Sequence, residues 1–424
     1  MPRHSFAAVL YSTLVLMMLA GPAVGQEELN DNRKIEKYRT GSETMTEGVY
    51  RRLGKAQEDV AAEKYEEAIV ALNRLSNSSL NDYEEALVLQ TFGYAYIQQS
   101  NIRLAIDYFE KSLAMESLPG EAQQGMLYSL ASLYLSQGRY QQAIDTMRMW
   151  FRYEAKPTPD AYMVIATSFV EFQRFDDALP YVQKARSISD EPREPWYMLE
   201  LAIYFEKERF SRAAALLKNM LKFWPDNGKY WDMLASTYLE LGQDKNALDA
   251  LMVAYANNLI EDNSRLMTVV QLNLSLEIPF AAGLILEAEM AAGRIEKTKK
   301  NLEILLQAWI SAKEYARALK TMDQLGALAE DGEYFMRKAG IHNELGEWSK
   351  VILAVEQALT KGVEDSAGAH MLAGMAYTEL QQFNAALNAF RNAGNEGDDK
   401  QRKNAAAWIS FVQEKMALKT AKIS

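Results

Sequence analysis

Apolar residues recur at helical spacing in residues 228–261, which read GKYWDMLASTYLELGQDKNALDALMVAYANNLIE. Positions i, i+3, i+4 and i+7 of the first half hold Trp231, Leu234, Ala235 and Tyr238, which form one apolar helix face. Gly242 interrupts the pattern, and a second apolar face follows with Ala247, Leu251 and Ala254. The segment therefore predicts two amphipathic helices joined by a turn.

The alanine at the position of Ala247 recurs along most of the chain. Its equivalents are Ala68, Ala105, Ala143, Ala178, Ala213, Ala318 and Ala386, with Val351 in one copy. An apolar or aromatic residue stands three positions earlier in most copies: Tyr65, Ile102, Tyr140, Phe175, Phe210, Tyr315, Trp348 and Phe383. The gap between Ala247 and Ala318 fits two repeats, so a degenerate repeat is expected at 263–295. There Pro279 lies near the expected start of the second helix, and either Ala281 or Ala282 fits the marker position.

The pattern W-x2-L-A-x2-Y…A-x3-L resembles the tetratricopeptide repeat (TPR) family. The resemblance implies an all-α fold, a TPR α-solenoid in which about ten helix-turn-helix repeats form a right-handed superhelix. The repeats are predicted to occupy residues 49–394. Residues 395–424 are expected to form a C-terminal capping helix and tail, in which 400–418 are helical. One face of that helix carries Trp408, Phe411, Val412 and Met416.

The N-terminus has the pattern of a secretory signal peptide. Arg3 precedes an uncharged apolar run at 6–20, and Ala23 and Gly25 place small residues before a predicted cleavage site. Residues 1–25 are therefore predicted to be removed, and the mature protein is expected in the periplasm. The alternative is a membrane anchor, but this run is shorter than the roughly 20 residues that a span requires.

Residues 26–48 are polar and charged, with few candidates for a core. This composition predicts a linker or flexible arm, with a short helix conceivable at 33–38.

Composition limits the chemistry of the chain. The sequence contains no cysteine, which excludes a lipoprotein, a disulfide scaffold and a cysteine nucleophile. A formal net charge of −11 disfavours a nucleic-acid surface. No phosphate loop, nucleophile elbow or zinc motif occurs, and His342 and His370 are expected to serve repeat packing. We therefore predict no enzyme, no cofactor, no metal, and no membrane span after signal cleavage.

The TPR resemblance also implies where a partner would bind, because the first helices of the repeats line a groove. The predicted groove residues are Gln90, Tyr94, Tyr128, Ser132, Met163, Thr167, Glu171, Met198, Glu206, Asp232, Ser236 and Glu240. Recurrent Glu beside Tyr and Met favours a basic and apolar extended segment as the ligand. The alternative is that these glutamates are solvated helix ends and the methionines fill the core.

A narrower resemblance covers nearly the whole chain. The opening VYRRLGKAQEDVAAEKYEEAIVAL and the degenerate LEIPFAAGLILEAEMAAGRIEK resemble the periplasmic TPR proteins of gammaproteobacterial TonB–ExbB–ExbD systems. This resemblance implies a non-catalytic scaffold for energised uptake, with the Pro- and Lys-rich TonB periplasmic linker as a partner. Two alternatives remain: a scaffold for envelope polysaccharide synthesis, secretion or outer-membrane protein assembly, and a cell-wall enzyme. The enzyme requires a separate catalytic domain, for which the repeats leave no room.

Overall fold

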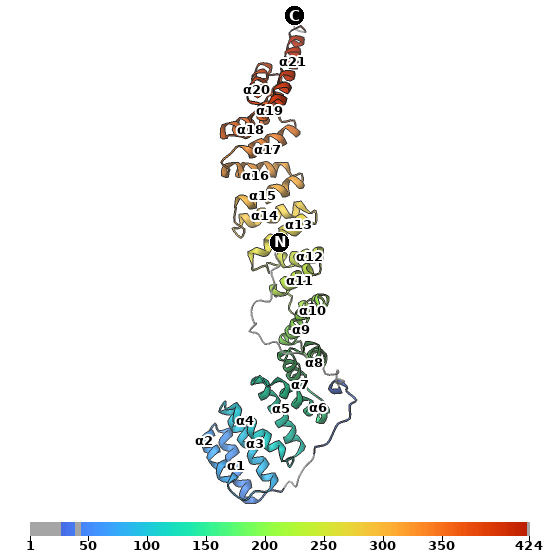
Figure 1. Ribbon diagram of the computed structural model, residues 1–424, viewed down its shortest axis with the longest axis vertical. Helices are drawn as coiled ribbons and strands as arrows, with labels where there is room; N and C mark the ends of the chain where they lie inside the picture. The colour runs from blue at the N-terminus through green and yellow to red at the C-terminus, as the bar shows by residue number, and fades with distance from the viewer. Residues whose placement is uncertain (1–26, 39–43, 422–424) are drawn as a thin grey trace. The chain divides into compact units, whose positions relative to one another are not determined.

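The computed structural model of the chain describes residues 27–38 and 44–421. Over these residues it contains 21 α-helices, one 3-10 helix and no strand, which confirms the predicted all-α repeat solenoid (Figure 1). The predicted signal peptide at 1–25 lies outside the described residues. Within the described ranges, every helix is too short or too polar to cross a membrane.

The chain divides into two compact units, which meet in sequence between Arg209 and Phe210. The first unit contains η1 (Glu27–Leu29), α1 (Glu47–Ala61), α2 (Tyr65–Ser76), α3 (Asp82–Gln98), α4 (Ile102–Ala114), α5 (Gly120–Ser136), α6 (Tyr140–Tyr153), α7 (Pro159–Glu171), α8 (Phe175–Ile188) and α9 (Glu194–Glu206). The second unit contains α10 (Phe210–Phe223), α11 (Gly228–Glu240), α12 (Asp244–Ala256), α13 (Asn263–Ser275), α14 (Pro279–Ala291), α15 (Lys299–Ser311), α16 (Tyr315–Leu328), α17 (Glu333–Glu344), α18 (Trp348–Lys361), α19 (Ser366–Glu379), α20 (Phe383–Glu396) and α21 (Asp399–Ala421).

Along the sequence, helices α1–α20 alternate as the first (odd-numbered) and second (even-numbered) helices of ten repeats. Within each unit, every helix contacts the next helix along the chain. In the first unit, the first helices α1 and α3 also contact each other, as do α5 and α7. This nearest-neighbour packing is the arrangement expected of a repeat protein.

The marker residue is the fourth residue of every second helix, and its side chain is fully buried in all ten repeats. The degenerate repeat follows the same rule, because Ala282 and not Ala281 is the fourth residue of α14. Pro279 is the first residue of that helix, where the missing N–H costs no hydrogen bond. A small residue is needed here because the second helix packs closely against its neighbours, and Val351 is the largest residue at this position.

Each of the ten turns inside a repeat contains one residue with a left-handed backbone. These residues are Glu63, Ser100, Gly138, Gln173, Glu208, Gly242, Glu277, Lys313, Gly346 and Gln381. The next N–H then bonds back to a carbonyl in the last turn of the first helix, as Arg174 N does to Phe169 O at 2.8 Å. This bond ends the first helix and fixes the direction of the second.

Most of these left-handed positions lack glycine, so they carry strain that glycine would remove. Gln173 has φ of 58°, and a left-handed conformation costs a residue with a Cβ about 1–2 kcal/mol. We expect Gln173→Gly to raise the free energy of unfolding by about 0.5–1 kcal/mol, because part of the gain is offset by the greater freedom of glycine in the unfolded chain. Denaturant unfolding followed by circular dichroism measures the change.

The reverse substitution at an equivalent turn is the control. Gly242 has φ of 65° and open space around its missing Cβ, so Gly242→Gln adds strain without a clash. We expect a loss of about 1 kcal/mol. If both substitutions changed the free energy of unfolding in the same direction, backbone strain would not govern these turns.

The C-terminal helix α21 confirms the predicted cap, but its buried face differs from the prediction. Val412 is fully buried, and the ring of Trp408 stacks on Phe390 of α20 at 5.4 Å. Phe411 and Met416 are 42% and 37% exposed. The buried face follows Ala405, Trp408 and Val412, whose spacing lets α20 cover all three.

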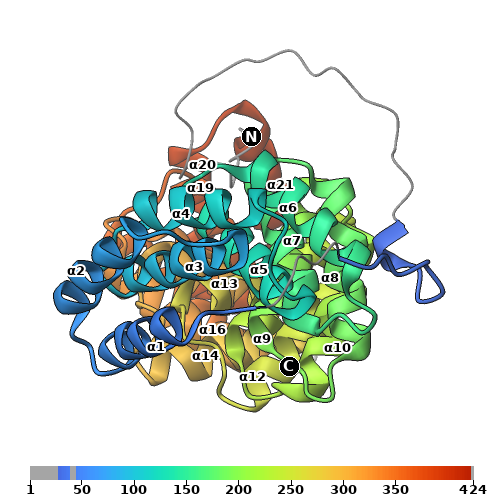
Figure 2. The same cartoon turned by 90° about the horizontal axis from the view of Figure 1, so that it is seen from below.

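The described part of the N-terminal arm packs against the repeats. Its only helical turn in the described range is η1, so the helix suggested at 33–38 is wrong. The arm lies beside α6 and α8 in both views (Figures 1 and 2). Contacts with these helices take the place of the internal hydrogen bonds that a helix would provide.

Candidate peptide-binding site

The predicted groove residues of the first unit lie on the first helices α3, α5, α7 and α9, and none of them is buried. They are Gln90 and Tyr94 on α3, Tyr128 and Ser132 on α5, Met163, Thr167 and Glu171 on α7, and Met198 and Glu206 on α9. Tyr94, Glu171, Met198 and Glu206 are exposed, and the others are partly buried. The side chains are therefore accessible, as the groove prediction requires, while their role stays a prediction.

In the structure, Tyr94 lies beside Gln90 and beside Ser129 of the next first helix, α5. Ser129 was not among the predicted groove residues. Burial raises the pKa of the Tyr94 hydroxyl, and hydrogen bonds with Ser129 and Gln90 oppose the rise. The ring meets Phe109 edge-on at 5.0 Å, yet 37% of the residue stays exposed. Tyr94 thus offers a fixed aromatic surface with a polar tip.

Tyr128 and Met163 are only partly available to a partner. Both pack against the buried cluster of the third and fourth repeats, where the Tyr128 ring lies 5.7 Å from that of Trp150. Burial raises the pKa of Tyr128, and the negative charge of Asp160 adds to the effect. The Ser132 hydroxyl donates to the Tyr128 carbonyl at 3.1 Å. These residues thus serve repeat packing as well as the surface.

In the second unit, the predicted groove residues Asp232 and Ser236 are paired inside the protein. Arg265 of α13 places its Nε 2.5 Å from Asp232 Oδ1, and its Nη2 donates to Ser236 Oγ at 2.9 Å. This cation neutralises Asp232, so Asp232 is not an open carboxylate for a basic ligand. The sequence prediction missed Arg265 because it considered each repeat separately.

Glutamate ends five of the first helices. Glu171, Glu206, Glu240, Glu344 and Glu379 are the last residues of α7, α9, α11, α17 and α19. A carboxylate at a helix C-terminus is opposed by the helix dipole, so helix stability does not explain this choice. All five are exposed.

The two histidines of the repeats contact different carboxylates. His342 is buried, with Nδ1 2.6 Å from Glu347 Oε2, and His370 Nε2 lies 3.7 Å from Glu396 Oε1. Hydrogen bonds from Lys350 and then His342 lower the pKa of Glu347. Among the described residues, no three His, Cys, Asp or Glu side chains form a group that could hold a metal ion.

The arm provides a second set of contacts, and Arg33 is at its centre. Arg33 Nε donates to the Phe151 carbonyl at 3.2 Å, and Nη2 donates to the Glu154 carbonyl at 2.5 Å. The backbone N–H of Glu36 donates to the Arg152 carbonyl at 2.9 Å. The last carbonyls of a helix lack partners within the helix, so the arm caps the C-terminus of α6.

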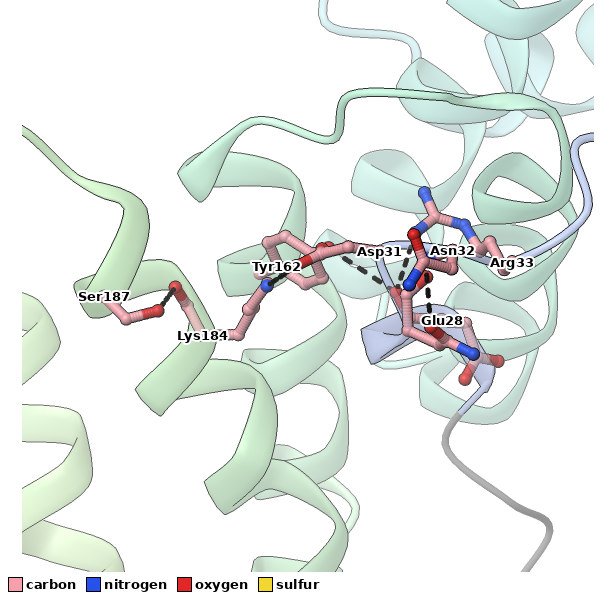
Figure 3. Close-up of polar contacts among 8 residues, drawn as sticks. Glu28, Asp31, Asn32, Arg33, Tyr162, Lys184 and Ser187 are labelled. Carbon is pink, nitrogen blue, oxygen red and sulfur yellow. Dashed lines mark hydrogen bonds and ion pairs between the residues drawn. The ribbon is translucent and has the colours of Figure 1, made fainter.

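Two carboxylates of the arm bind side chains of α6 and α8. Glu28 lies 3.2 Å from Arg148 Nε and accepts a hydrogen bond from Tyr181 at 3.0 Å. Lys184 Nζ donates to Asp31 at 2.8 Å, a contact that Figure 3 shows beside Tyr162. The hydrogen bond from Lys184 lowers the pKa of Asp31, whereas burial and then the Glu28 charge raise that of Tyr181.

Tyr38 fixes the end of the described arm. Its ring stacks on Tyr153 with centroids 3.8 Å apart, and it covers Gly120, where a Cβ would come within 2.9 Å of the ring. Burial raises the pKa of Tyr38. The arm is therefore held at both ends of its described length.

Residues 91–158 of the chain match the family described as "Tetratricopeptide repeat". A curated relative is the TPR repeat-containing protein YpiA of Bacillus subtilis (strain 168), which is 20% identical over 227 residues. The match covers 53% of this chain and 51% of the relative, so the chain spans about half the length of that protein.

Solved structures with a similar fold include YrrB, described as a TPR protein with an unusual peptide-binding site. It is 17% identical, covers 41% of this chain and 86% of its own, and has a TM-score of 0.34. The structure of Naa15/Naa10 bound to HypK-THB is 13% identical and covers 84% of this chain and 60% of its own, with a TM-score of 0.42. These likenesses concern the fold alone.

Proposed function

We propose that the protein is a periplasmic, non-catalytic scaffold whose first helices bind an extended basic and apolar segment of a partner. The observation that carries the proposal is the placement of exposed glutamates at the ends of α7 and α9. The Tyr140 hydroxyl donates to Glu171 at 3.5 Å, and no ion pair holds Glu171 or Glu206 among the described residues. Their charge is therefore available to attract cations.

The same helices supply apolar contacts for such a segment. Tyr94 and Met198 are each 37% exposed, on α3 and α9. Tyr rings and flexible Met side chains bind extended, proline-containing chains without demanding one sequence. A segment that alternates Lys with Pro would satisfy both the carboxylates and the apolar side chains.

The charge of the groove is tested by Glu171→Lys combined with Glu206→Lys. The probe is a fluorescein-labelled peptide of alternating Lys and Pro, and its anisotropy reports binding. We expect the double variant to bind about tenfold more weakly or worse, since two attractive contacts become repulsive; tenfold corresponds to about 1.4 kcal/mol. Circular dichroism should remain unchanged.

The matched control makes the same change in net charge on second helices. Glu67 of α2 and Asp145 of α6 are exposed, and Glu67→Lys with Asp145→Lys should leave binding near the wild-type value. Equal losses in both variants would mean that the peptide responds to net charge alone. Unchanged affinity in the groove variant would reject the groove.

The proposed cellular context is a TonB–ExbB–ExbD system, with the Pro- and Lys-rich TonB linker as ligand. It rests on the sequence resemblance and on the charge of the exposed glutamates. Periplasmic crosslinking followed by mass spectrometry should recover TonB-system subunits. Recovery of only polysaccharide synthase, secretion or outer-membrane assembly subunits would favour the alternative scaffold instead. Export is tested by fusing alkaline phosphatase behind residues 1–48 of the chain, because this enzyme is active only after it has crossed into the periplasm.

A further inference from the structure

The contacts of the arm define a surface with its own chemistry. We propose that the face of α6–α8 is a second peptide-binding site, filled by residues 27–38 of the same chain. It is selective for a segment that presents two carboxylates followed by a guanidinium. This face belongs mainly to second helices, so the site is separate from the groove proposed above.

The first subsite holds a carboxylate. Arg148 of α6 and Tyr181 of α8 contact Glu28 from two successive repeats. The Glu28 side chain is only 12% exposed. The Tyr162 hydroxyl also donates to the Glu28 carbonyl at 3.5 Å. A charged side chain that is this buried requires an opposite charge, so an apolar or basic residue would not replace Glu28.

The second subsite holds another carboxylate three residues later. Lys184 keeps 21% of its side-chain exposure and binds both oxygens of Asp31, at 2.9 and 2.8 Å. Between the two acids, Leu29 packs on the buried cluster of the third and fourth repeats. Tyr181 and Lys184 stand three residues apart on α8 and hold Glu28 and Asp31, so α8 matches the spacing of the two acids.

The third subsite requires a donor and not an acceptor. The carbonyls of Phe151 and Glu154 at the end of α6 both accept from Arg33. A guanidinium fits this site because its N–H groups diverge in one plane, and the helix dipole favours a positive charge here. A purely acidic segment would fail at this subsite, and a purely basic one at the first two.

The occupant is the chain's own arm because attachment raises its local concentration. Covalent attachment makes the binding of the arm an intramolecular event, so a free segment competes with it at a disadvantage. A separate segment with the same pattern can therefore bind only when the arm is released. The site thus recognises one pattern and is normally closed to partners.

The experiment uses the full chain and a fluorescein-labelled peptide of residues 27–38 as the probe. Arg33→Glu places a carboxylate against the carbonyls of α6 and should release the arm without altering the site. We expect this variant to bind the wild-type peptide at least about tenfold more tightly than the wild-type chain does. Lys34→Glu makes the same charge change at an exposed neighbour and should behave like the wild type.

Two further measurements identify the site and the occupant. Adding Arg148→Glu to Arg33→Glu should abolish peptide binding, because it places two carboxylates together. The absence of native cysteine permits Asp31→Cys and Lys184→Cys to be joined by a bismaleimide. The double-cysteine chain should crosslink within itself, while a mixture of the two single-cysteine chains should stay monomeric.

Three results would overturn the proposal. Equal peptide binding by the wild-type and Arg33→Glu chains, or none by either, would show that the arm does not occupy a reusable site. Unchanged binding after Arg148→Glu would place the peptide elsewhere. Crosslinked dimers in the mixture would assign the arm to a second copy of the chain.

Discussion

Replacement of Arg186 by methionine is expected to lower the free energy of unfolding of the first unit by about 3–5 kcal/mol. Arg186 forms an ion pair with Glu200, which is 3% exposed, and its guanidinium lies 3.7 Å from the centre of the Tyr197 ring. Glu200 also accepts hydrogen bonds from Gln183 and Tyr204 at 3.1 and 2.8 Å. Without Arg186, a buried carboxylate would remain without its cation.

The double variant Arg186→Met with Glu200→Met separates this explanation from a loss of packing. It removes both charges, so most of the lost stability should return. Denaturant unfolding of both variants gives the comparison. If the double variant were as unstable as the single one, the loss would come from packing and not from the buried charge.

Replacement of Trp309 by alanine is expected to cost the second unit about 3–5 kcal/mol. Trp309 of α15 is fully buried, and its ring lies over Gly283 of α14, where a Cβ would come within 2.6 Å of it. The guanidinium of Arg317 covers the ring at 4.8 Å from its centre. Alanine would leave a cavity that two rigid helices cannot close.

Trp309→Phe serves as the conservative variant, because it keeps an aromatic ring over Gly283 and leaves a smaller cavity. We expect it to lose less than half as much stability, measured by thermal and denaturant unfolding. Equal losses for alanine and phenylalanine would show that the ring does not fill the space between α14 and α15.

The repeat architecture could be predicted because its signals are local and recur. Ala247 and its equivalents marked every second helix, and the expected position of the degenerate repeat matches α13 and α14. The choice between Ala281 and Ala282 needed the structure, since either residue fits the spacing. Gln173 and Glu208 occupy the repeat position that holds Gly138, Gly242 and Gly346 in other copies, and this alignment was the only sequence sign of their left-handed backbone.

The polar contacts could not be predicted in the same way, because they join different repeats. Arg265 pairs with Asp232 across two first helices, and Arg33 finds carbonyls of α6. Neither contact leaves a periodic pattern. One sequence signal could have pointed to the arm contacts: the arm carries the acids Glu28 and Asp31, and the second helices carry the cations Arg148 and Lys184 about one repeat apart.

Most contacts within the two units join helices that follow one another in the chain, so they close only short loops. The arm differs, since its hydrogen bonds to α6 and α8 join residues 116 to 153 positions apart. Contacts between distant residues form late, because more chain entropy is lost in closing the loop. The repeats can therefore assemble from neighbour to neighbour before the whole chain is folded. The arm, although synthesised before all of them, has to wait for α6 and α8 before it can reach its place.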